Sequence, residues 1–132
     1  MIKKLAQQHD EKLYLLFRVF VGLLFLQHGL QKLFGIFTDK DPVILMSLMG
    51  LAGIIEFGGG ILIILGLFTR TVATIGAVEM VSAFFIAHYP RGIVPIENGG
   101  ELALLYFTAF LILIAHGSRQ WSLDKLFFGK SG

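Results

Sequence analysis

Residues 45–68 read LMSLMGLAGIIEFGGGILIILGLF and hold one ionisable side chain, Glu56, among apolar residues, glycines and a single serine. A helix needs about 20 mostly apolar residues to cross the hydrocarbon core of a bilayer. The segment has that length, and its glycines suit contacts between membrane helices, where small residues let backbones approach closely. This stretch therefore predicts a membrane-spanning helix that carries one carboxylate.

Other apolar stretches flank this segment on both sides, at about 13–34, 71–89 and 101–116. Thr69-Arg70-Thr71 leaves almost no loop after the quoted segment, so the helices on either side of it should be antiparallel neighbours. The sequence thus predicts an all-α fold, an integral membrane four-helix bundle, formed by a single domain over residues 1–132.

The overall composition supports a lipid environment and excludes several function classes. Hydrophobic residues make up 55% and charged residues 15%, whereas soluble domains carry about 25% charged residues. The net charge of +2 and the absence of a basic stripe argue against nucleic acid as a partner. The chain has no cysteine, which excludes disulfides, thiolate catalysis and iron–sulfur ligation.

The charges outside the apolar stretches predict the orientation in the membrane. One side receives Lys3, Lys4, Lys12, Arg70, Arg119, Lys125 and Lys130. The other side receives Lys40 and Arg91, with the loop at 88–100. The positive-inside rule then predicts a multi-pass protein of the cell (plasma) membrane with both termini in the cytoplasm. After residue 116, Trp121 and its neighbours predict a short C-terminal interfacial segment.

Ionisable residues inside the predicted spans are the candidate site. Arg18, Gly22, Phe25, Gly29 and Lys32 recur at alternating steps of four and three residues, so they share one face of the first helix. A charge facing lipid costs about 2.5–3.5 kcal/mol on insertion scales, so such side chains should turn inward. We expect two polar groups. The inner group is Arg18, Glu56 and Glu79, and the outer group is His28, Lys32, His88 and Glu101.

Two interpretations of these residues stay open. Glu56 and Glu79 are candidate catalytic groups for proton exchange, because buried carboxylates in membranes often mark proton or ligand sites. The alternative is that Arg18 paired with a glutamate only locks helix packing. The remaining members form a ligand-binding or structural polar core. Hydrogen-bonded histidines are favoured over haem or metal ligands, and no metal site is predicted, because neither HxxxH nor ExxH spacing occurs.

Several motifs in order resemble the DoxX family of small bacterial and archaeal membrane proteins. The motifs are Arg18-x3-Gly22-x2-Phe25-x2-His28-Gly29-x-Gln31-Lys32-Leu33-Phe34, Glu56 with its glycines, Leu65-Gly66-Leu67-Phe68-Thr69-Arg70, Asn98-Gly99-Gly100-Glu101, and Ser122-Leu123-Asp124. The chain departs from many members at His116-Gly117-Ser118, where they read Gly-Pro-Gly. The resemblance implies a four-helix membrane protein with a polar interior, but it assigns no firm chemical role to any motif residue.

The resemblance also implies a class of function. The members that gave the family its name are similar to quinone-reducing membrane subunits, so the first hypothesis is a membrane subunit of an oxidoreductase system. Such a subunit would bind a quinone or another lipid-soluble ligand as its cofactor and would need a soluble oxidoreductase partner as the electron source. The alternative is a non-enzymatic lipid-binding or scaffold protein. A third hypothesis is a small transporter or channel formed by a homo-oligomer.

Overall fold

The computed structural model describes residues 1–130, and every regular element in that part of the chain is helical. The last two residues of the predicted domain, 131–132, lie outside the described residues. The elements are α1 (Ile2–Gln8), α2 (Asp10–Phe34), α3 (Leu48–Leu65), α4 (Thr69–Ala83), the π-helical turn η1 (Phe84–His88), the 3-10 turn η2 (Tyr89–Arg91), α5 (Pro95–Asn98), α6 (Glu101–His116) and α7 (Leu123–Phe128).

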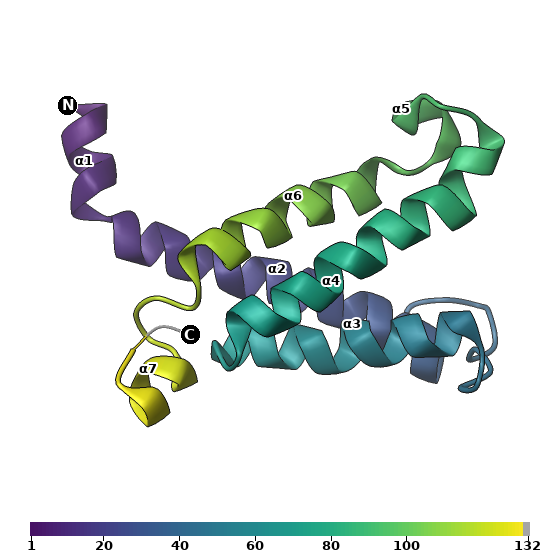
Figure 1. Cartoon of the computed structure of the whole chain (residues 1–132), viewed down its shortest axis with the longest axis horizontal. Coiled ribbons are helices and arrows are strands. Elements are labelled where there is room, and N and C mark those ends of the chain that lie inside the picture. Colours follow the sequence, from purple (N-terminus) through teal and green to yellow (C-terminus); the bar gives the residue numbers. More distant parts are fainter. Residues whose placement is uncertain (131–132) are drawn as a thin grey trace.

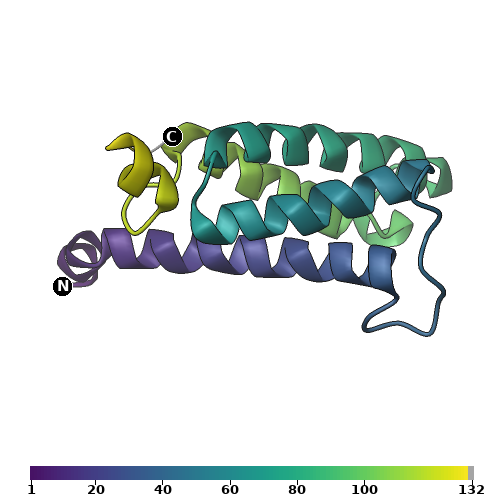
Figure 2. The same cartoon turned by 90° about the horizontal axis from the view of Figure 1, so that it is seen from below.

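The longer helices α2, α3, α4 and α6 run alongside one another, and each is antiparallel to the one before it (Figures 1 and 2). The closest packing joins α2 to α3 and α4 to α6, and α3 also packs on α4, whereas α2 barely meets α6. The molecule therefore consists of two tight helix pairs with two looser seams, α3/α4 and α2/α6. The N-terminus and α7 lie at one end, and the loop at 35–47 lies at the other (Figure 2).

Length and composition make three helical stretches suitable for crossing a membrane: Asp10–Phe34, Leu48–Leu65 and Thr69–Arg91. The helix α6 is also apolar but has only 16 residues. Large apolar side chains such as Phe20, Val78 and Leu105 are exposed on the outside of these helices. An outer surface of this kind suits contact with lipid rather than with water.

The ends of the helices follow from local chemistry. The α3 helix begins at Leu48, later than the apolar pattern predicts, because the Ser47 hydroxyl accepts a hydrogen bond from the Gly50 N–H and caps the helix. It ends where Gly66 adopts a left-handed conformation, φ 66°. The α4 helix gives way at Phe84 to the π-helical turn η1, a wider turn often found at functional sites.

Glycines bring α2 and α3 into backbone contact. A Cβ atom added to Gly29 would lie 2.3 Å from the Phe57 backbone nitrogen, and one added to Gly60 would lie 2.6 Å from that of Leu26. Neither backbone can move aside without separating the two helices. The close approach in turn places side chains of α2 and α3 against each other across the seam.

Gly29→Ala should lower the free energy of unfolding by about 2 kcal/mol or more, since overpacking a tight contact typically costs 1–3 kcal/mol. Gly58 is the matched control on α3, because its added Cβ would meet nothing within 4 Å. Gly58→Ala should stabilise the protein by about 0.5–1 kcal/mol through helix propensity. Thermal unfolding followed by circular dichroism in mild detergent would compare the two. Equal effects would contradict the close α2–α3 contact.

Candidate functional site

An ion pair between α2 and α3 lies at the centre of the polar interior. The Lys32 ammonium lies 2.6 Å from both carboxylate oxygens of Glu56. The Glu56 side chain is only 4% exposed, and that of Lys32 is 19% exposed. Close packing around Gly53, where an added Cβ would lie 3.2 Å from the Lys32 Cβ, brings the two helices together here. Lys32 therefore neutralises Glu56.

Glu79 on α4 supplies a second carboxylate next to this pair. It lies within electrostatic range of both Glu56 and Lys32. Both of its carboxylate oxygens are buried, and neither accepts a hydrogen bond from an N–H group or a hydroxyl of residues 1–130, but the carboxyl group lies within hydrogen-bonding reach of the Glu56 carboxyl group. Two carboxylates and one ammonium leave one negative charge over. A buried charge of this kind is costly unless a proton or a ligand compensates it.

Tyr106 on α6 completes this interior group from the other side, and the sequence analysis did not identify it. Its side chain is 6% exposed, and its buried hydroxyl has no hydrogen-bond partner in the described part of the chain. It lies within electrostatic range of Glu56, and its ring packs edge-on against His28 with centroids 5.9 Å apart. The one signal in the sequence was a lone tyrosine in the apolar stretch 101–116.

The expected grouping of Arg18 with the two glutamates is wrong. The Arg18 guanidinium, with its residue 1% exposed, instead donates hydrogen bonds to backbone carbonyl oxygens near the end of the molecule that holds α7. These acceptors are Ile64 (3.4 Å), Gln120 (3.3 Å), Trp121 (2.9 Å) and Ser118. Arg18 therefore anchors the segment after α6, whose irregular backbone offers carbonyl groups that no helix uses.

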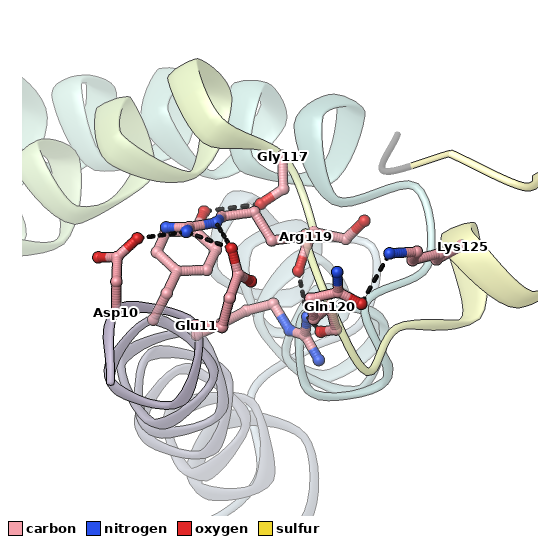
Figure 3. Close-up of polar contacts among 9 residues, drawn as sticks. Asp10, Glu11, Gly117, Arg119, Gln120 and Lys125 are labelled. Atoms are coloured by element: carbon pink, nitrogen blue, oxygen red, sulfur yellow. Dashed lines mark hydrogen bonds and ion pairs between the residues drawn. The ribbon is translucent and has the colours of Figure 1, made fainter. Parts of the chain in front are cut away.

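A second set of contacts fixes the same segment to the start of α2 (Figure 3). Arg119 donates hydrogen bonds to Asp10, at 2.5 Å, and to Glu11. The hydrogen bond to Asp10 is the main reason that the pKa of the Arg119 guanidinium is raised above its ordinary value. Lys125 and Gln120 form a further side-chain hydrogen bond of 2.7 Å. This end of the molecule is a structural clamp, separate from the interior group.

The expected outer group of His28, Lys32, His88 and Glu101 does not assemble. Lys32 forms an ion pair with Glu56, and the His28 ring packs against the Tyr106 ring. The His88 Nδ1 atom lies 3.2 Å from the Asn98 carbonyl oxygen and so fixes the loop before α6. Glu101 is exposed at the first turn of α6. Lys32 and His88 thus have nearer partners, Glu56 on α3 and the Asn98 carbonyl group, whereas the His28 ring lies against Tyr106 of α6.

Each of the two loose seams contains an apolar groove. The α3/α4 groove has a volume of about 400 Å³ and is lined mainly by apolar side chains, with Glu79 and two hydroxyl groups, Thr74 and Ser82, that donate to carbonyl groups of their own helix. It continues along η1 at Ile86 and Ala87. The α2/α6 groove has a volume of about 420 Å³ and is lined by aliphatic side chains, Phe17 and Tyr106. The interior group is thus bordered by a groove on each side. Among residues 1–130, no three His, Cys, Asp or Glu side chains form a metal-binding group.

Comparison with known proteins gives consistent matches. The family model described as DoxX matches residues 13–89. An uncharacterized protein of Haemophilus influenzae is 42% identical over 86% of this chain and 89% of its own length. An uncharacterized membrane protein of Mycobacterium tuberculosis is 30% identical over 82% of this chain and 77% of its own. The Bacillus subtilis protein CatD, described as a candidate oxidoreductase, is 29% identical over 86% of each chain. No solved structure matches at a significant level.

Proposed function

Because this chain belongs to the DoxX family of membrane proteins, we propose that it is the membrane subunit of an oxidoreductase system and binds a quinone or another lipid-soluble ligand. The interior charges and the grooves support a ligand-binding role. The likeness to CatD, described as a candidate oxidoreductase, supports the redox setting. A soluble partner would supply the electrons, since this chain has no cysteine to donate them.

In this proposal α2, α3, α4 with its π-helical continuation, and α6 form a four-helix bundle in the plasma membrane. The apolar outer surface and the length of three helical stretches support it. The short α6 would span with its ends in the interfaces. Cations such as Lys3, Lys4 and Lys12 near the chain end that lies beside α7 support a cytoplasmic location for both termini.

The observation that carries the proposal is Glu79, a buried carboxyl group beside that of Glu56, which accepts no hydrogen bond from an N–H or hydroxyl donor of residues 1–130 and whose side chain lines a groove on a loose seam. A lipid-soluble ligand could reach this groove directly from the bilayer. Reduction of a quinone to a hydroquinone takes up two protons, which must arrive in a site that excludes water. Glu79, next to the Lys32–Glu56 pair, has the chemistry to hold such a proton and pass it on. Its oxygens are shielded from the groove, so exchange with a ligand requires rotation of the side chain.

Glu79→Gln tests whether this carboxyl group contributes to ligand binding, because glutamine keeps the shape of the side chain but has neither its negative charge nor its exchangeable proton. Glu79 is a better target than Glu56, whose replacement would leave the Lys32 ammonium without its partner. We expect the quinone recovered with Glu79→Gln to fall about tenfold, which corresponds to the loss of about 1.4 kcal/mol of binding free energy. Native mass spectrometry and lipid extraction of the gently solubilised protein would measure it.

The matched control is Glu97→Gln, which removes an exposed carboxylate from the loop before α6. Its bound quinone should equal that of the wild type. If wild type and both variants carry only phospholipid in equal amounts, the redox proposal fails. The nearly all-apolar lining of both grooves would then favour a non-enzymatic lipid-binding or scaffold protein.

A further inference from the structure

The α2/α6 seam holds a groove with one distinctive polar group. Its walls are side chains such as Val21 and Leu24 of α2 and Leu105 and Ala109 of α6. The Thr108 hydroxyl, also in the lining, already donates to the Leu105 carbonyl oxygen at 2.7 Å. Among the described lining side chains, this leaves the Tyr106 hydroxyl as the polar group with unused hydrogen-bonding capacity.

The buried hydroxyl of Tyr106 calls for an acceptor. A buried donor that lacks a partner costs about 1–3 kcal/mol, and Tyr hydroxyl groups usually find a partner when buried. Glu56, the nearby anion, accepts from Lys32 through both of its oxygens, and the Tyr106 hydroxyl makes no hydrogen bond to it. The hydroxyl oxygen is shielded from the groove, as the Glu79 oxygens are from theirs, so a molecule in the groove that offers an acceptor atom would remove this cost once the Tyr106 side chain rotates toward it.

We propose that the α2/α6 groove is a ligand site of its own, for a neutral apolar molecule that carries a carbonyl acceptor. The ligand is neutral because no charged side chain is among the lining residues. It carries a carbonyl because the group it meets is a hydrogen-bond donor. Its remaining surface is apolar because the rest of the wall is mainly aliphatic and aromatic.

This site differs in kind from the α3/α4 groove. The two grooves occupy opposite seams, since the helices follow the order α2, α3, α4, α6 around the molecule. Glu79 offers acceptor atoms on one side, and Tyr106 offers a donor on the other. Glu56 lies within electrostatic range of both. The two grooves therefore lie on either side of one polar group, and a ligand would meet an acceptor in the first groove and a donor in the second. The α2/α6 site does not depend on the redox role proposed above.

The test uses two photoreactive alkyl diazirine probes that differ only in a carbonyl group, present in one and replaced by methylene in the other. The full chain in nanodiscs is labelled with each probe, and the labelled peptides are identified by mass spectrometry. The ketone probe should label residues 17–24 and 102–112 about three- to tenfold more than the methylene probe, the range expected for one hydrogen bond. Equal labelling would show a groove that takes any acyl chain and would overturn the proposal.

Three variants locate the effect. Tyr106→Phe should abolish the preference for the ketone while leaving the melting temperature unchanged or slightly higher, because the lost hydroxyl has no partner in residues 1–130. Ala109→Trp should fill the groove and suppress both probes. Glu79→Gln should leave the ketone labelling intact. A preference that survives Tyr106→Phe, or one lost in Glu79→Gln, would refute a separate site, and the second result would leave the α3/α4 proposal standing.

Discussion

Arg18→Met should lower the free energy of unfolding by about 4 kcal/mol or more, enough to remove much of the stability of an average protein. The guanidinium donates hydrogen bonds to carbonyl groups on two segments. These are the Ile64 carbonyl near the end of α3 and carbonyl groups after α6 such as those of Ser118 and Trp121. Methionine fills a similar volume but donates no hydrogen bond. Each carbonyl left buried without a partner costs about 1–3 kcal/mol. Thermal unfolding in mild detergent would measure the loss.

Arg119→Met provides the matched control at the same end of the molecule. Arg119 bonds the exposed carboxylate of Asp10 and the partly exposed one of Glu11, and it lies over the Tyr14 ring, 4.7 Å from its centroid. Exposed ion pairs contribute about 0–1 kcal/mol, so this variant should cost about 1 kcal/mol. If both substitutions lower the free energy of unfolding by the same amount, the hydrogen bonds of Arg18 do not stabilise this end of the molecule. Its buried position would then reflect packing alone.

Arg18 also shows where sequence reasoning succeeds and where it stops. Periodicity placed Arg18 and Lys32 on the inner face of one helix, because burial of a charge is a local constraint along a helix. The partner of each side chain is set by the register between helices, which no single helix specifies. The Arg18 guanidinium reaches backbone carbonyl groups of the segment after α6 only because that segment folds back against α2. Nothing in the apolar pattern predicts such a return.

The helices themselves were easier to predict than the site. Long apolar runs predict α2 and α3, and the caps at Ser47 and Gly66 explain the differences at the ends of α3. The π-helical turn η1 was not predictable, since its residues read like any other apolar helix. Tyr106 was missed for a related reason: a tyrosine in an apolar helix can face lipid, an interface or the interior. Only the packing of α6 against the other helices, which sets the Tyr106 ring against Phe25 and His28 of α2, decides which.

Lys32→Met should be as damaging as Arg18→Met, but for an electrostatic reason. Lys32 is the cation that holds Glu56, with Glu79 in electrostatic range of both. Removing one partner of a buried ion pair typically costs about 3–5 kcal/mol, because the remaining charge stays buried without compensation. We expect a loss of that size in thermal unfolding, together with low yields of folded protein.

The double variant Lys32→Met with Glu56→Gln separates charge from packing. It removes both members of the pair and leaves a neutral interior apart from Glu79. Replacing a buried pair by neutral groups of similar volume is often close to neutral in stability, so the double variant should recover most of the loss seen in Lys32→Met. The favourable coupling between the two substitutions should reach about 2–3 kcal/mol, at the upper end for residues in contact. A double variant as unstable as Lys32→Met would mean that the Lys32 stem packing against α3, and not its charge, holds the helix pair together.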